Sequence, residues 1–139
     1  RCPYCGKPAR IISAAGILPA SSKVTQLLAC SNYPECDSYV CVHPGTSKPM
    51  GTVADPTLRR LRQEAHHHFN KIYQSGIMPR KDAYNWMADK LLMPLSEAHI
   101  GRLSEYSLQL IIAESKKLLA YRRSLAYQSR AGDDRRMRA

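Results

Sequence analysis

Four cysteines, arranged as two pairs, are the residues of this chain whose type and spacing could do chemistry. Cys2 and Cys5 form a Cys-x2-Cys pair, and Cys30 and Cys36 follow later as a Cys-x5-Cys pair. Four thiolates are a ligand set that Zn²⁺ takes in closed, tetrahedral structural sites. We therefore predict one structural zinc ion bound by all four, with no coordination position left for a catalytic water.

Other readings of the cysteines compete with this prediction. Cys41 or His43 could replace Cys36 as a ligand, although Cys41 is better explained as a small buried residue of a strand. An iron–sulfur cluster also uses four thiolates, but the two-turn spacing favours zinc. A redox Cys-x2-Cys pair is expected beside a βαβ unit, which the sequence does not show. The odd total of five cysteines favours a metal site in a reducing compartment, and therefore a cytoplasmic protein.

Short strands and a hairpin must bring the two cysteine pairs together. Residues 9–13, 24–29 and 39–42 are compatible with strands, and turn-forming residues separate the first two runs. Residues 43–53 resemble an extended connector. The sequence thus predicts a zinc ribbon of short antiparallel strands over residues 1–53.

The hydrophobic pattern becomes helical after residue 54. Asp55 and Pro56 form a start signal for a first helix, which ends before Gly76, and a second helix is expected over about 81–92. Ser104 is expected to cap a last, longer helix. The predicted class is α+β, with the ribbon packed on a bundle of three to four helices. The predicted domains are 1–53, a helical module over 54–129 and a basic flexible tail over 130–139.

The charge of the chain indicates a polyanionic partner. It carries 21 Lys and Arg against 11 Asp and Glu, a formal net charge of +10. An excess of this size is typical of nucleic-acid-binding proteins, although solubility alone is the plainer explanation. Tyr4 and Tyr33, on the two cysteine turns, could stack on unpaired bases. The candidate phosphate contacts are Arg59, Arg60, Arg62, Lys116, Lys117, Arg122, Arg123 and Arg130.

Two resemblances support this interpretation. The segments Cys2-Pro3-Tyr4-Cys5-Gly6 and Cys30-Ser31-Asn32-Tyr33-Pro34-Glu35-Cys36 resemble the C-terminal zinc fingers of type IA DNA topoisomerases, which are zinc ribbons that bind single-stranded DNA. A wider pattern over residues 2–113, including Pro49-Met50-Gly51-Thr52, Trp86-Met87-Ala88 and His99-Ile100-Gly101, is similar to a phage and bacterial family of zinc-finger-containing domains of unknown function. The second resemblance implies a phage or prophage origin.

These features predict a zinc-stabilised, non-enzymatic accessory or regulatory protein that binds DNA or RNA, located in the host cytoplasm if it is phage-encoded. No apolar run is long enough to span a bilayer, and no small-molecule substrate is expected. A first rival is a phage factor that docks on a host protein complex, such as RNA polymerase or a defence system. A second is a nuclease, which would require His43, His66 and His99 to converge.

Overall fold

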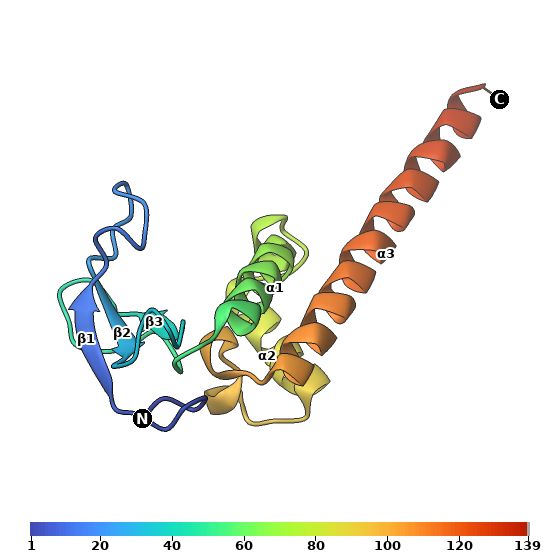
Figure 1. Cartoon of the computed structure of the whole chain (residues 1–139). Helices are drawn as coiled ribbons and strands as arrows, with labels where there is room; N and C mark the ends of the chain where they lie inside the picture. The colour runs from blue at the N-terminus through green and yellow to red at the C-terminus, as the bar shows by residue number, and fades with distance from the viewer. Residues whose placement is uncertain (139) are drawn as a thin grey trace. The chain divides into compact units, whose positions relative to one another are not determined.

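The structure is a computed structural model, which describes the backbone of residues 1–138 and the side chains of residues 1–125. Within this part, a three-stranded antiparallel sheet precedes three α-helices, as Figure 1 shows. The predicted α+β class is therefore confirmed. The chain forms two compact units. The first contains Arg1–Arg62 and Ile100–Arg102, and the second contains Gln63–His99 and the chain from Leu103 onward.

The sheet carries one cysteine of the second pair at the end of its central strand. Its strands are β1 (Ala9–Ser13), β2 (Gln26–Cys30) and β3 (Tyr39–Cys41), paired in the order β1-β2-β3. Leu27 and Ala29 alternate with more exposed residues along β2 and are fully buried, as a half-buried strand requires. Their burial fixes the register, which places Cys30 opposite Ala9 on β1.

Helix α1 (Pro56–Gln74) begins at the predicted signal. The Asp55 carboxylate accepts a hydrogen bond of 2.8 Å from the Leu58 backbone N–H, which caps the first turn. Pro56 occupies the first helical position, where its missing N–H costs nothing. The helix ends before Gly76, whose φ of 82° lies in the left-handed region that glycine adopts without strain.

The remaining helices also follow the sequence signals closely. Helix α2 spans Arg80–Leu91 and is followed by two short 3₁₀ turns, η1 (Leu95–Glu97) and η2 (Ile100–Arg102). Helix α3 begins at Glu105, where the Ser104 hydroxyl accepts a 3.2 Å hydrogen bond from the Ser107 backbone N–H. None of the helices in the described part combines the length and apolar character that a membrane span needs.

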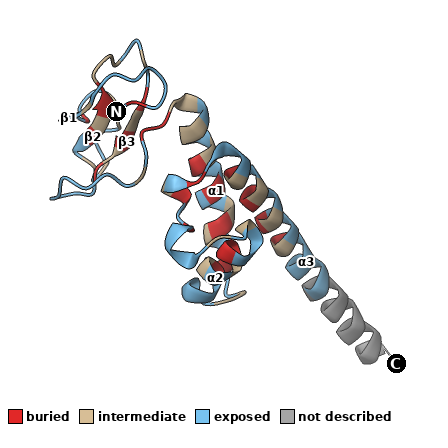
Figure 2. Cartoon of the chain, turned by 90° about the horizontal axis from the view of Figure 1, so that it is seen from below, coloured by how far each residue is buried: buried red, intermediate tan, exposed pale blue. Residues whose placement is uncertain are grey.

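All three helices contribute buried apolar residues to the core of the second unit. Figure 2 shows buried positions along the faces of its helices. The Phe69 ring meets the ring of Tyr84 edge-on, with 5.1 Å between centroids, which joins α1 to α2. The fully buried large side chains of this unit are Phe69, Ile72, Met87, Leu108 and Ile111. They all lie after residue 54, where the sequence predicts a helical hydrophobic pattern.

The end of α3 differs from the sequence prediction. The predicted helix ends near residue 129, whereas α3 spans Glu105–Arg138. The predicted flexibility of residues 130–139 stays a prediction. The segment contains no proline, and a single internal glycine costs a helix only about 1 kcal/mol. The side chains of this segment lie outside the described residues. The predicted division at residues 53 and 54 stays a prediction, because the change of compact unit falls within α1.

Two glycines let the connector lie close to η2 within the first unit. The Thr52 backbone N–H donates a 2.9 Å hydrogen bond to the Gly101 carbonyl, so the connector lies directly against η2. A Cβ atom on Gly51 would overlap the Gly101 carbonyl and lie 2.8 Å from its Cα. A Cβ atom on Gly101 would overlap the Met50 carbonyl. Both positions therefore require the absence of a side chain.

Candidate metal centre

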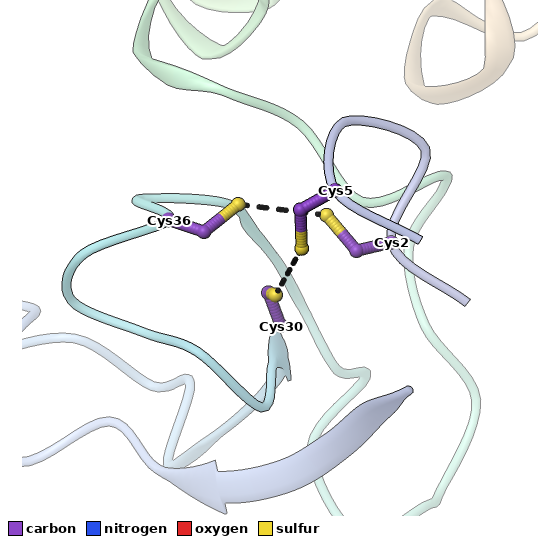
Figure 3. A group of neighbouring side chains, drawn as sticks. All are labelled: Cys2, Cys5, Cys30 and Cys36. Atoms are coloured by element: carbon purple, nitrogen blue, oxygen red, sulfur yellow. Dashed lines mark hydrogen bonds between the residues drawn. The ribbon is translucent and has the colours of Figure 1, made fainter. Parts of the chain in front are cut away.

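The four predicted ligands come together in the structure, as Figure 3 shows. The Sγ atoms of Cys2, Cys5, Cys30 and Cys36 all lie within 4.8 Å of one another. The Sγ atoms are 3.6 Å apart between Cys2 and Cys36 and 3.3 Å apart between Cys5 and Cys30. A zinc ion with Zn–S bonds of about 2.3 Å needs thiolates about 3.8 Å apart at the corners of a tetrahedron. The cluster therefore fits one zinc ion.

The first cysteine turn is fixed by its own backbone. The Gly6 N–H donates to the Cys2 carbonyl at 2.9 Å, and the Cys2 N–H donates to the Lys7 carbonyl at 2.8 Å. Gly6 has a φ of 76°, which a residue with a side chain rarely adopts. This turn buries Cys2 and leaves Cys5 exposed. Both thiols of the Cys-x2-Cys pair therefore reach the ion site from the same short loop.

The second turn is wider and is supported by groups that the sequence does not predict. The Asn32 backbone N–H lies 3.4 Å from the Cys30 Sγ, and its carbonyl accepts the Cys36 N–H at 2.9 Å. The buried Ser38 hydroxyl lies 3.5 Å from the Cys36 Sγ. Such contacts orient ligands that a metal alone would not fix. The sole signal for this support in the sequence is a hydroxyl residue, Ser38, two positions after Cys36, the last of the four ligands.

The pKa values of the thiols show why the cluster suits a cation. Burial raises the pKa of Cys2, but hydrogen bonds from the backbone N–H groups of Tyr4 and Cys5 lower it to about 6. The hydrogen bond from Asn32 lowers the pKa of Cys30, but burial and the neighbouring thiols together raise it to about 12. The four sulfurs therefore do not all ionise by themselves. A divalent cation between them would stabilise all four thiolates.

The competing ligands lie outside the cluster. Cys41 is half-buried on β3, where burial raises the pKa of its thiol, and His43 is exposed in the connector. In the part of the chain that the structure describes, no other group of three or more His, Cys, Asp or Glu could hold a metal ion. An iron–sulfur cluster contains several atoms and would hold the thiolates farther apart than this one-ion spacing.

Both cysteine turns contact the start of α1. The Tyr4 hydroxyl accepts a 3.1 Å hydrogen bond from the Asp55 backbone N–H, next to the helix cap. From the other turn, the Asp37 carboxylate and carbonyl accept hydrogen bonds from Arg59 at 3.1 and 2.9 Å. The Tyr33 ring packs edge-on against Tyr39, with 6.0 Å between centroids. Both proposed stacking residues, Tyr4 and Tyr33, therefore have contacts within the unit.

Two of the three clustered arginines on α1 are engaged inside the fold. The Arg59 guanidinium lies 3.9 Å from the centroid of the Tyr39 ring and donates to the Ala54 carbonyl at 2.9 Å. Arg62 is buried and donates to the Thr52 carbonyl and hydroxyl at 2.7 and 2.6 Å. The donors of Arg59 and Arg62 thus already hold the second cysteine turn and the connector. Their expected contact with phosphates stays a prediction.

The Arg59→Ala variant should lower the free energy of unfolding by about 2 kcal/mol. The change removes three hydrogen bonds, one of them to a carboxylate, and the stacking on Tyr39. Chemical denaturation of the zinc-loaded protein measures the effect. Arg60→Ala is the matched control, because Arg60 is the exposed neighbour with the same charge. Equal stability of the two variants would contradict the structural role of Arg59.

The remaining candidate cations differ in how far they are engaged. Arg60, Arg122 and Arg123 are exposed and have no ion pair in the described part of the chain. Lys116 lies 3.7 Å from the Glu64 carboxylate, and Lys117 lies 3.5 Å from that of Glu114. These exposed pairs are weak and leave the amines accessible. The side chain of Arg130 lies outside the described residues.

Comparison with known proteins agrees with the metal centre. A protein-family model described as a zinc-finger-containing domain matches residues 1–118. The match includes all four clustered cysteines and the glycine pair, Gly51 and Gly101. No curated protein and no solved structure matches the chain.

Proposed function

Because this chain belongs to the family of zinc-finger-containing domains, we propose that it is a non-enzymatic accessory or regulatory protein that binds nucleic acid, encoded by a phage or prophage. In this proposal, zinc holds the ribbon, and cations of the helices contact phosphates without reading sequence. The family description includes zinc binding and states no activity. The nucleic-acid partner, the phage origin and the non-enzymatic role therefore belong to the proposal alone.

The observation that carries the proposal is the set of free cations on exposed helix surfaces. The chain has a formal net charge of +10. Arg60, Arg122 and Arg123 have no acidic partner in the described part of the chain, and the Lys117 side chain is 75% exposed. Cations of this kind release counterions from a phosphate backbone, which supplies most of non-specific binding.

Affinity for single-stranded and double-stranded DNA and for RNA should fall steeply with salt. About six phosphate contacts give a slope near −5 when log K is plotted against log salt concentration. The double variant Arg122→Ala/Arg123→Ala should make this slope shallower by about 2. Fluorescence anisotropy across salt concentrations measures both effects.

A matched control removes two charges elsewhere. Lys23 and Lys48 are exposed residues of the first unit that the proposal does not use, so Lys23→Ala/Lys48→Ala should keep the original slope. A flat salt dependence, or equal effects of the two double variants, would contradict nucleic-acid binding through α3.

Exposed aromatic and apolar residues on α3 support a second candidate, a factor that docks on a host protein complex. Tyr106 is 75% exposed, Tyr121 is 64% exposed and Leu125 is 41% exposed. Aromatic residues with this exposure are enriched at protein interfaces. Capture of one host protein after nuclease treatment, with no affinity for DNA or RNA, would favour this candidate.

A further inference from the structure

A cavity lies in the second unit, where the start of α2 meets η1. The cavity has a volume of about 670 Å³ and contains no acidic residue in its lining. This volume lies within the range of small-molecule sites, about 300–1,000 Å³. Its lining residues are Arg80, Lys81, Tyr84, Leu95, Ser96 and His99. All of them belong to the second unit and are separate from the metal centre.

Two tyrosine rings hold one cation of this cavity in place. The Arg80 guanidinium carbon lies 5.5 Å from the centroid of the Tyr84 ring and 5.9 Å from that of the Tyr73 ring. Hydrogen bonding to Tyr84 further stabilises the charged form and raises the pKa of Arg80. The side chain nevertheless remains exposed. Arg80 is therefore a positioned cation with donors still available to a ligand.

Three other polar side chains of the cavity have no partner in the described part of the chain. The Lys81 amine, the Ser96 hydroxyl and the His99 ring make no side-chain hydrogen bond or ion pair there. The nearest acids along the chain, Asp82 on α2 and Glu97 on η1, are exposed and do not line the cavity. Two cations, a hydroxyl and an imidazole thus face a space without any anionic neighbour in its wall.

We propose that this cavity binds the phosphate monoester of a nucleotide, either free or at the end of a strand. Arg80, Lys81 and Ser96 offer the charged and neutral donors that phosphate oxygens accept. Tyr84 and Leu95 provide an aromatic and an apolar wall against which a base or a sugar can pack. The volume exceeds what an inorganic phosphate ion would fill, so the adjacent nucleoside occupies the rest.

The site goes beyond the proposed function, because it does not use the cations of α3. Phosphates inside a strand are diesters with one negative charge, whereas a terminal monoester carries close to two at neutral pH. Two cations in one cavity therefore favour a terminal or free nucleotide over the continuous backbone.

Isothermal titration with adenosine 5′-monophosphate, adenosine and inorganic phosphate tests the inference on the full, zinc-loaded chain. The nucleotide should bind at least about ten-fold more tightly than either of the other probes. Arg80→Ala and Lys81→Ala should each weaken nucleotide binding by about ten-fold. Lys71→Ala, which removes an exposed cation of the same unit outside the cavity, should bind as the wild type does.

A second arm separates the two sources of the ligand. Oligonucleotides with and without a 5′-phosphate are compared by competition against the same nucleotide. Preference for the phosphorylated strand assigns the cavity to strand ends, and binding of the free nucleotide alone assigns it to nucleotides. Zinc content and the unfolding midpoint check that Lys81→Ala, which breaks no contact in the described fold, remains native.

The two proposals fail on different results. If neither phosphorylated probe binds, or if Arg80→Ala and Lys81→Ala leave nucleotide affinity unchanged, the cavity assignment is overturned. Strand binding that does not depend on the 5′-phosphate but depends on Arg122 and Arg123 would support the proposed function. It would contradict the assignment of the cavity to strand ends. Tight nucleotide binding with no affinity for strands would support the cavity assignment and contradict the proposed function.

Discussion

The Cys2→Ser variant should be purified without stoichiometric zinc and with its first unit unfolded. A serine hydroxyl is not ionised at neutral pH and replaces a thiolate poorly, so the site loses one of its four ligands. The first unit has few large buried side chains, and the largest apolar ones that are almost fully inaccessible are Leu27, Val42 and Ile100. Zinc binding contributes on the order of 10–16 kcal/mol in small modules, as much as or more than the usual stability of a domain.

Elemental analysis measures the zinc, and amide NMR spectra measure the order of residues 1–62. Cys41→Ser is the matched control, because Cys41 lies outside the cluster and should keep one zinc ion per chain with native spectra. A chelator added to the wild type should reproduce the Cys2→Ser spectra. A Cys41→Ser variant that loses its zinc, or a Cys2→Ser variant that keeps it, would show a different ligand set.

The metal cluster is the part of the site that the sequence predicts best. Thiols have few alternative roles when they occur as two pairs on short turns, and zinc geometry then limits how the turns can meet. The groups that support the ligands are not predicted by the sequence. The Asn32 N–H and the Ser38 hydroxyl act through local backbone geometry, which residue type alone does not determine.

The surroundings of the arginines on α1 are a feature that the sequence does not predict. Positions 59, 60 and 62 all carry arginine, and the sequence predicts the same phosphate contact for each. In the structure, Arg59 and Arg62 make hydrogen bonds within the fold, whereas Arg60 is exposed. Successive helical residues point about 100° apart, so neighbours on the chain face different surroundings. Which surroundings these are depends on where the connector and the second cysteine turn lie. That placement is a long-range property. The hydrophobic periodicity correctly predicts the helix but carries no information about which segments pack against it.

The Gly51→Ala variant should lower the free energy of unfolding of the first unit by about 3 kcal/mol. The added Cβ would overlap the Gly101 carbonyl and lie 2.6 Å from its carbonyl carbon, and both are backbone atoms that cannot rotate away. Relief requires the connector and η2 to separate, which stretches the hydrogen bond from Thr52 to Gly101. Overpacking against fixed atoms commonly costs about 1–3 kcal/mol, and a backbone clash belongs at the upper end.

Gly16→Ala provides the matched control for this steric argument. Gly16 lies in the loop between β1 and β2 with a φ of 79° and no heavy atom within 4 Å of an added Cβ. Its substitution should cost only the left-handed backbone strain, about 1 kcal/mol. Chemical denaturation of both zinc-loaded variants, followed by amide NMR of the first unit, compares them. A cost for Gly51→Ala no larger than that for Gly16→Ala would mean that the connector does not pack tightly on η2. The position would then require glycine for some reason other than close backbone contact.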